Sequence, residues 1–113
     1  MDLNKNIVIA HDVGTSSVKS ALIDSDGNIL CHATHSYPFF SPQPGWAEQE
    51  PMDYWNAIVT NTKELSAAIN KERILGMVFT TQAMGIIPVD KREMYFVEIF
   101  RGWMAGPKNR HAG

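Results

Sequence analysis

The feature that most constrains the fold is a short polar turn between two apolar runs. Residues 7–10 are apolar, residues 12–17 contain one acid, one glycine and three hydroxyl side chains, and residues 18–23 are again largely apolar. This pattern predicts a buried strand over residues 7–11, a tight turn and a second strand over residues 17–24. Glycine lets the backbone approach a ligand, and successive N–H groups with hydroxyls can surround an anion. The turn therefore indicates a site for a phosphate group with Mg²⁺ near the acid.

The next residues predict that the two strands continue into an antiparallel meander. Residues 24–28 read Asp-Ser-Asp-Gly-Asn, a sequence that favours a hairpin, and residues 29–37 follow as a third strand near an edge of the sheet. Residues 38–50 are rich in proline and also contain Phe39, Phe40 and Trp46. We therefore expect a structured loop there and not a flexible linker.

The strongest helix signal covers residues 51–71. Pro51 suits a first helical turn, and Asp53 suits the positive end of the helix dipole. Apolar side chains recur at the helical period. The buried face is expected to contain Trp55, Ile58, Val59, Thr62, Leu65 and Ile69.

Two further strands are predicted after the helix. Residues 74–80 form an apolar run of strand length and are expected to be a buried strand. Residues 81–85 predict a turn. Residues 86–90 predict another strand, which Pro88 confines to an edge or to irregular pairing.

Charge and cysteine content limit the classes of function. The net charge of −2 argues against a protein that binds nucleic acid through general basicity. No apolar run approaches the ~20 residues of a membrane span, so no membrane partner is expected. The single cysteine, Cys31, excludes an internal disulfide and favours a reducing compartment. We expect a cytoplasmic protein in which Cys31 is a small, partly buried strand residue.

The motifs together resemble a known family. Residues 12–19 match neither a P-loop nor a Gly-x-Gly-x-x-Gly turn, but they resemble the first phosphate motif of the actin-like ATPase fold. The motifs at residues 26–30, 44–51 and 82–85 are similar to those of the N-terminal domain of FGGY-type carbohydrate kinases, and most to the xylulokinase-like branch. The Gly-Trp-x-Glu-Gln-x-Pro segment within residues 44–51 makes the likeness specific.

The resemblance implies a fold and a set of site residues. The fold is α/β, a partial actin-like ATPase (ribonuclease H-like) domain whose mixed sheet has an antiparallel three-strand meander and one main helix. ATP and Mg²⁺ are the implied cofactors, with Asp12 near the metal through water. The implied phosphate-binding residues are Asp12, Gly14, Thr15, Ser16, Ser17 and Lys19. The implied residues on the substrate side are Trp46, Glu48, Gln82, Ala83, Met84 and Gly85.

Some of these residues have a purely structural alternative. Trp46 suits an anchor of the loop as well as it suits the substrate side, and Glu48 suits a hydrogen bond that fixes the loop. His11 stands where the family commonly has an apolar residue, so we expect a structural histidine with satisfied hydrogen bonds. Residues 83–84 are Ala-Met where xylulokinases usually have Met-His.

The two ends of the chain differ in character. Residues 1–90 carry five Lys/Arg against ten Asp/Glu, whereas residues 91–113 carry five against two. We interpret residues 1–90 as the N-terminal part of a carbohydrate kinase domain and residues 91–113 as an atypical tail. Reading one base back, the codons of residues 103–105 encode Asp-Gly, as in the family. We therefore hypothesise that the tail from about Arg92 is read out of frame.

The predicted function is that of a kinase fragment. Family enzymes are several times longer, and neither their general-base aspartate nor their adenine pocket can be placed in this chain. We expect a fragment of an ATP-dependent kinase for a sugar or polyol hydroxyl, with a xylulose-like substrate favoured and little activity alone. Full-length relatives are expected to form homodimers. Two alternatives stay open: a non-catalytic phosphate- or partner-binding module of the actin-like superfamily, and a decayed gene product.

Overall fold

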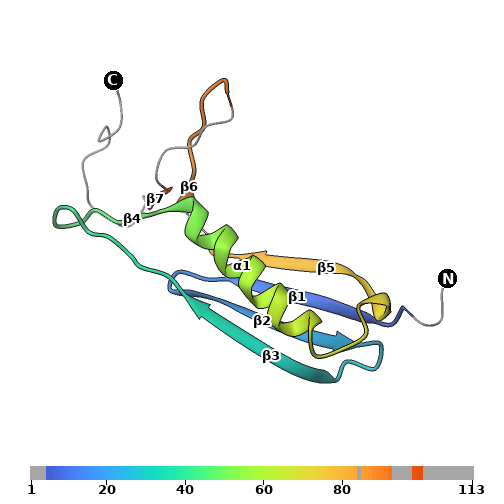
Figure 1. Cartoon of the computed structure of the whole chain (residues 1–113). Coiled ribbons are helices and arrows are strands. Elements are labelled where there is room, and N and C mark those ends of the chain that lie inside the picture. Colours follow the sequence, from blue (N-terminus) through green and yellow to red (C-terminus); the bar gives the residue numbers. More distant parts are fainter. Residues whose placement is uncertain (1–4, 84, 93–97, 101–113) are drawn as a thin grey trace.

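The computed structural model describes residues 5–83, 85–92 and 98–100. Its centre is a four-stranded mixed sheet in the order β3-β2-β1-β5, with helix α1 lying across one face (Figure 1). These elements are β1 Ile7–Val13, β2 Ser17–Asp24, β3 Ile29–Ser36, α1 Pro51–Ser66 and β5 Ile74–Thr81. The α/β architecture with one main helix agrees with the prediction.

Strands β1, β2 and β3 form the predicted antiparallel meander. The hairpin between β2 and β3 turns at Gly27, whose φ of 85° is a backbone conformation that favours glycine. The Asp24 carboxylate accepts hydrogen bonds from the backbone N–H groups of Asp26 and Asn28, both at 2.9 Å. The hydrogen bonds from Asn28, first among several causes, lower the pKa of Asp24. The third strand lies at an edge, as expected.

Helix α1 begins where the sequence predicts and ends earlier. Pro51 occupies the first turn, and the Glu50 side chain caps the helix by accepting a hydrogen bond from the Met52 N–H at 3.4 Å. The predicted end at residue 71 is wrong, because the helix stops at Ser66. Asn70 adopts an extended backbone, and its side chain accepts from the Glu72 N–H at 3.1 Å. It thereby starts the separate 3-10 turn η1, Lys71–Arg73.

The buried face of α1 agrees with the predicted one in part, because Leu65 is buried and Ile58 packs against the core, as expected. Trp55 is 59% exposed, whereas the helix residues in the core are Tyr54, Ala57, Asn61 and Leu65. The apolar period missed part of this face because a small and a polar residue contribute to it. The core has two clusters. One contains Ile7, Ile9, Leu22, Ala33 and Leu65, and the other contains Val13, Val18, Tyr37, Tyr54 and Ala57.

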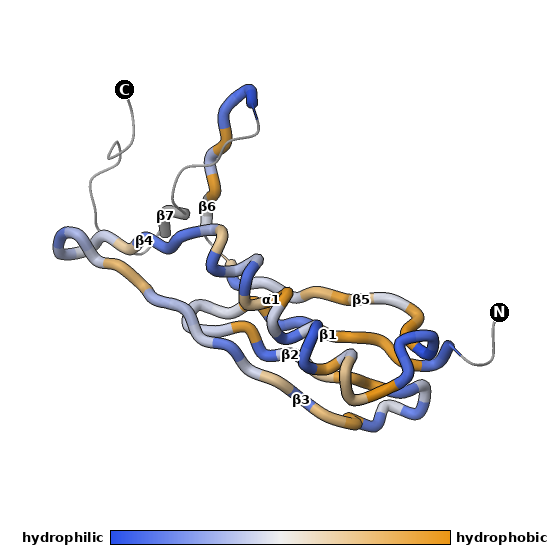
Figure 2. Tube along the Cα trace, viewed as in Figure 1, coloured by the Kyte–Doolittle hydropathy of each residue, from blue (hydrophilic) through white to orange (hydrophobic). Residues whose placement is uncertain are grey.

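Strand β5 pairs parallel to β1 and forms an edge of the sheet. The prediction of a buried strand is wrong, because Leu75, Met77, Val78 and Phe79 are each about half exposed. Helix α1 packs mainly on β2 and β3, so both faces of β5 stay largely open. The tube coloured by hydropathy shows this apolar edge strand clearly (Figure 2).

A second, smaller sheet lies beside the N-terminal end of α1, in the order β4-β7-β6 (Figure 1). Its strands are β4 Glu48–Gln49, β6 Gly85–Ile86 and β7 Glu98–Phe100. Strand β4 falls inside the predicted loop. Of the strand predicted at residues 86–90, the structure has Ile86 in β6 and a single bridge residue at Val89, and Pro88 between them has no N–H group for pairing. Because β7 belongs to this sheet, part of the segment after residue 90 joins the fold; the boundary itself stays a prediction.

The helices give no sign of a membrane span. Within residues 5–83, 85–92 and 98–100, no helix has the length and apolarity that crossing a membrane requires.

Candidate functional site

Asp12 and Lys19 lie side by side on the open face of the four-stranded sheet. Strand β1 runs two residues further than predicted, so Asp12 is a strand residue directly opposite Lys19 in β2. Neighbouring strand residues point to opposite faces. His11 and Ser20 contact helix α1, so Asp12 and Lys19 point away from it. The hydroxyl of Thr80 in β5 donates to the Asp12 carboxylate at 3.0 Å.

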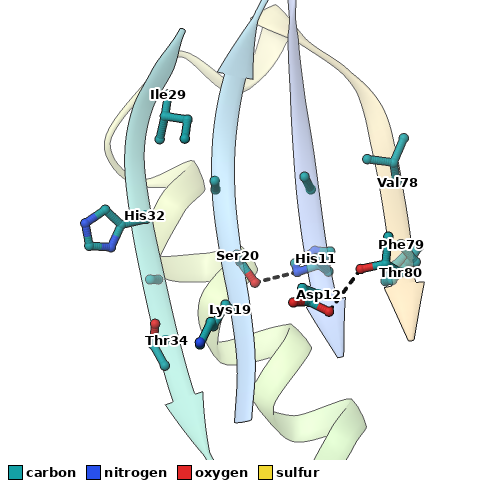
Figure 3. A pocket seen from close by; sticks show the side chains of 13 residues that line it. His11, Asp12, Lys19, Ser20, Ile29, His32, Thr34, Val78, Phe79 and Thr80 are labelled. Carbon is teal, nitrogen blue, oxygen red and sulfur yellow. Dashed lines mark hydrogen bonds between the residues drawn. The ribbon is translucent and has the colours of Figure 1, made fainter. Parts of the chain in front are cut away.

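These side chains line a cavity along the sheet. It has a volume of about 410 Å³ and is bounded by residues of β1, β2, β3 and β5 (Figure 3). Asp12, Lys19 and Thr80 are among its lining residues, and His32 and Thr34 line it from β3. The predicted phosphate-side acid and lysine are thus brought together at a cavity whose lining is mostly apolar and includes Ala21, Val78 and Phe79.

The carbonyl groups of the turn between β1 and β2 accept hydrogen bonds from within the protein. The Gly14 carbonyl accepts a hydrogen bond from the Tyr37 hydroxyl, the Thr15 carbonyl from the Gln49 amide at 2.6 Å, and the Ser16 carbonyl from the Tyr37 N–H at 3.1 Å. The Gly14 N–H closes the turn on the Ser17 carbonyl at 2.9 Å. A Cβ atom at Gly14 would lie 3.2 Å from that same oxygen, which explains the glycine.

This arrangement fixes the direction of two N–H groups. In a trans peptide, the C=O of one residue and the N–H of the next point in opposite directions. Since the carbonyls of Gly14 and Thr15 point into the protein, the N–H groups of Thr15 and Ser16 point away from it. Neither N–H has a hydrogen-bond partner within the part of the chain that the structure describes, and both residues are exposed. Two outward N–H groups in succession form a concave donor site for an anion.

Gln82 lies beside the turn, although 67 residues separate it from Thr15. The parallel pairing of β1 with β5 brings the two strand ends together, and the Gln82 N–H donates to the Val13 carbonyl at 2.9 Å. The Thr15 hydroxyl then donates to the Gln82 side-chain oxygen at 2.9 Å. A residue predicted for the phosphate side and one predicted for the sugar side are therefore in direct contact.

Two residues that sequence reasoning gave no role complete this contact. The Gln82 amide donates to the Tyr54 hydroxyl at 3.2 Å, and that hydroxyl donates to the Gln49 side-chain oxygen at 2.6 Å. Gln49 in turn donates to the Thr15 carbonyl. Thr15, Gln82, Tyr54 and Gln49 thus form a closed ring of hydrogen bonds. The one sequence signal was the position of Gln49 inside the Gly-Trp-x-Glu-Gln-x-Pro segment.

The other residues predicted for the substrate side are more dispersed. Glu48 is buried in β4, where its backbone N–H and C=O both pair with Phe40, and Trp46 is half-buried in the preceding loop. Ala83 and Gly85 are exposed after the end of β5. Met84 lies outside the described residues. Among the predicted phosphate-side residues, Ser17 begins β2 and is half-buried.

His11 belongs to a buried polar cluster between the sheet and α1. Its Nδ1 lies 2.7 Å from the Ser20 hydroxyl, and its Nε2 lies 3.3 Å from the Thr62 hydroxyl. Thr62 donates to the Ile58 carbonyl and Ser20 accepts from the Asn61 amide. The imidazole tautomer that satisfies the contacts with Ser20 and Thr62 therefore has its proton on Nε2 and none on Nδ1. Burial lowers the pKa of His11, in keeping with a neutral structural histidine. The structural role predicted for His11 is confirmed.

The described residues do not form a protein metal cage. Among them, no three His, Cys, Asp or Glu side chains gather closely enough to bind a metal ion by themselves. The donor set at the turn is one carboxylate, Asp12, beside hydroxyl groups. Mg²⁺ commonly binds proteins through one or two carboxylates and completes its shell with water and substrate phosphates, so this donor set fits it.

Several known proteins are similar to this chain in sequence and in fold. Residues 7–101 match the N-terminal domain of the FGGY family of carbohydrate kinases. Glycerol kinase 1 of Saccharolobus solfataricus is 32% identical over 80 residues, which are 71% of this chain and 16% of that protein. The xylulose kinase of Staphylococcus epidermidis is 30% identical over 88 residues, 76% of this chain and 18% of that protein.

A solved structure confirms the predicted fold class. The crystal structure of a xyloylose kinase from Brucella ovis matches with a TM-score of 0.76 and 31% identity. The match covers 83% of this chain and 20% of that one. This chain therefore spans about a fifth or less of the length of the proteins that it matches.

Proposed function

Because this chain belongs to the FGGY family of carbohydrate kinases, as its motifs indicated, we propose that it forms the phosphate-binding part of an ATP-dependent kinase. The reaction is transfer of the γ-phosphoryl group of ATP to a hydroxyl group of a sugar or polyol. Phosphoryl transfer depends mainly on positioning and on neutralising charge. The turn between β1 and β2 suits that requirement.

The proposal rests on the directions of the backbone C=O and N–H groups in this turn. The carbonyls of Gly14 and Thr15 are occupied by protein donors, and the N–H groups of Thr15 and Ser16 point outward. Fixed backbone donors stabilise developing negative charge without reorganising during the reaction. We propose that these two N–H groups, with the hydroxyls of Thr15 and Ser16, bind the phosphates of ATP.

The charged pair on the sheet complements these donors. We propose that Asp12 holds Mg²⁺ through water, with Thr80 fixing the carboxylate by its hydrogen bond at 3.0 Å. Lys19, directly opposite Asp12, supplies a positive charge near the phosphates. When bound, Mg²⁺ neutralises phosphate charge and orients the transferred group.

The proposed substrate is a polyol or a pentulose, with a xylulose-like sugar favoured by the sequence motifs. Relatives carry the names glycerol kinase and xylulose kinase. Gln82 can both donate and accept hydrogen bonds, which suits a sugar hydroxyl at the end of β5. We expect this chain alone to bind ligands without turning them over, because no residue in it could be assigned as the general base.

Isothermal titration of the purified 113-residue chain with Mg-ATP tests the proposal. We expect saturable binding that Asp12→Asn weakens by about tenfold, the effect of losing a charged interaction worth ~1.4 kcal/mol. Asp26→Asn is the matched control, since Asp26 is also exposed and lies at the hairpin between β2 and β3, away from the turn. Equal affinity of wild type and Asp12→Asn would refute the role of Asp12.

Titrations with xylulose, glycerol and glucose then test the substrate side. Binding of xylulose or glycerol, but not of glucose, is the expected result. Binding of Mg-ATP without any sugar favours the alternative of a phosphate-binding module without catalysis. Binding of none of these ligands refutes the proposed function.

A further inference from the structure

We propose that Gln49 is a positioning residue that orients the Thr15–Ser16 peptide for phosphate binding, with Tyr54 holding Gln49 in place. The inference rests on the proposed function, since it assigns a role within the same turn. It concerns two residues that do not themselves reach the ligand side of the turn. Both are buried, Gln49 with 1% and Tyr54 with 8% of its surface exposed.

The orientation follows from the geometry of one peptide unit. The Gln49 amide donates to the Thr15 carbonyl at 2.6 Å, and this carbonyl points opposite to the Ser16 N–H. Without that donor, the carbonyl of this peptide loses its hydrogen bond to the protein, and only the neighbouring contacts of Gly14 and Ser16 restrain its rotation. The direction of the Ser16 N–H is then less firmly fixed. Gln49 thus acts on the ligand through the backbone of Ser16.

The Gln49 side chain is itself held from two sides. Its oxygen accepts from the Tyr54 hydroxyl at 2.6 Å, which leaves the amide group to donate to Thr15 and, at 3.4 Å, to the Pro38 carbonyl. The amide therefore has only one orientation that satisfies both ends. The Tyr54 ring is fixed in turn by edge-to-face contact with Tyr37, at 4.9 Å between centroids. Tyr37 also binds the Gly14 carbonyl, so both peptides of the turn rest on one aromatic pair.

Glutamine suits this position better than its close analogues. A glutamate keeps the acceptor for Tyr54 but has no donor for Thr15, and its charge faces a carbonyl oxygen. An asparagine is one methylene too short to reach both partners. A methionine keeps the length and apolar stem but makes neither hydrogen bond. Gln49→Met therefore removes the hydrogen bonds to Thr15 and Tyr54, and the longer one to Pro38, with little change of volume.

The ring also joins the two sides of the proposed site. Tyr54 accepts from the Gln82 amide at 3.2 Å, while Gln82 accepts from the Thr15 hydroxyl. Loss of the Gln49 contacts is therefore expected to loosen the turn and the end of β5 together.

The experiment combines amide exchange without ligand and binding of inorganic phosphate and Mg-ATP, both on the full chain. Exchange is followed at the Gly14 and Gln82 N–H groups, which bind the carbonyls of Ser17 and Val13. In Gln49→Met we expect exchange at both positions to be about tenfold faster and both ligands to bind about tenfold more weakly, as for one net hydrogen bond. Tyr54→Phe keeps the buried ring and is expected to show the same two changes to a smaller degree.

Thr62→Val is the matched control for general loss of stability. It also removes side-chain hydrogen bonds of a residue on α1, those to His11 and Ile58, but these do not connect to the turn. We expect this variant to melt earlier while its phosphate affinity and its exchange at Gly14 and Gln82 stay as in wild type.

The outcomes separate this inference from the proposed function. Unchanged exchange in Gln49→Met overturns the positioning role, whether or not the wild type binds phosphate. Faster exchange with unchanged affinity also overturns it, because the turn would then not depend on Gln49 for binding. If the wild type binds neither phosphate nor Mg-ATP, the proposed function fails, and exchange alone decides whether Gln49 holds the turn.

Discussion

Asn61 is the residue whose replacement tests the packing of α1 on the sheet most directly. Its side chain is 1% exposed, although asparagine is usually a surface residue. The amide donates to the Val18 carbonyl at 3.1 Å, to the Ser20 hydroxyl at 2.9 Å and, at the limit of a hydrogen bond, to the Ala33 carbonyl at 3.5 Å. One side chain of the helix thus binds both β2 and β3.

The expected cost of Asn61→Ala follows from these contacts. A buried polar group left without its partner costs about 1–3 kcal/mol. Val18 and Ala33 lie in paired strands, and Ser20 still has the His11 ring as a partner, so the acceptors are only partly deprived. We therefore expect a loss of about 2 kcal/mol in the free energy of unfolding. For a chain of this size that lowers the melting temperature by roughly 8–16 °C.

Urea denaturation followed by circular dichroism measures this loss, with Asn56→Ala as the matched control. Asn56 lies on the same helix and is exposed, so the same substitution there adds only helix propensity, roughly 0.5 kcal/mol of stabilisation. If Asn61→Ala changes the free energy of unfolding no more than Asn56→Ala does, Asn61 does not tie the helix to the sheet. The packing argument is then refuted.

Two further perturbations test other parts of the fold. Burial lowers the pKa of His11 below 6.5, so the unfolded chain binds more protons than the folded chain just below that value. The free energy of unfolding should therefore be independent of His11 above pH 6.5 and should fall as the pH decreases below it. Urea titrations between pH 7.5 and 5 measure this fall. It should persist in the control His32→Gln, which replaces an exposed imidazole, and should disappear in His11→Gln. Trp55→Ala should cost less than about 0.5 kcal/mol, whereas Leu65→Ala should cost about 3 kcal/mol. Thermal melts in which Trp55→Ala costs as much as Leu65→Ala would show that Trp55 is buried, as the sequence predicted.

The parts of the fold that were predictable are those determined by local sequence. The hairpin at residues 24–28 needs only Asp24 to bind nearby N–H groups and Gly27 to adopt positive φ, and both effects act within five residues. The start of α1 is equally local, since Pro51 has no N–H to satisfy. Which face of the helix is buried is not determined by local sequence. It depends on which side chains fit against β2 and β3, and there Ala57 and Asn61 replace the larger Trp55.

The site was predictable as a set of residues and not as a set of contacts. The turn at residues 12–19 contains glycine and hydroxyl residues that plain hairpin turns also use, and the later motifs in their order made it a signal of phosphate chemistry. Its contact with Gln82 depends on the parallel pairing of β1 with β5, which joins positions 67 residues apart. Gln49 and Tyr54 carry no chemical signature alone, and their role exists only once both lie beneath the turn.

On strands β1 and β2, the side chains that stabilise the fold and the side chains proposed to bind the ligand lie on opposite faces of the sheet. On the face against α1, the pair of His11 and Ser20 is bound by helix side chains; one residue nearer the turn on each strand, Asp12 and Lys19 pair on the open face. The apolar residues Ile7, Ile9 and Leu22 lie toward the other end of these strands. A second apolar cluster, which includes Val13 and Val18, lies next to the turn, so apolar burial anchors both ends of these strands and the hydrogen bonds add direction at the turn. A hydrogen bond depends on direction as well as distance, whereas apolar contact does not. That difference explains why a turn that must present N–H groups in fixed directions is held by a polar ring.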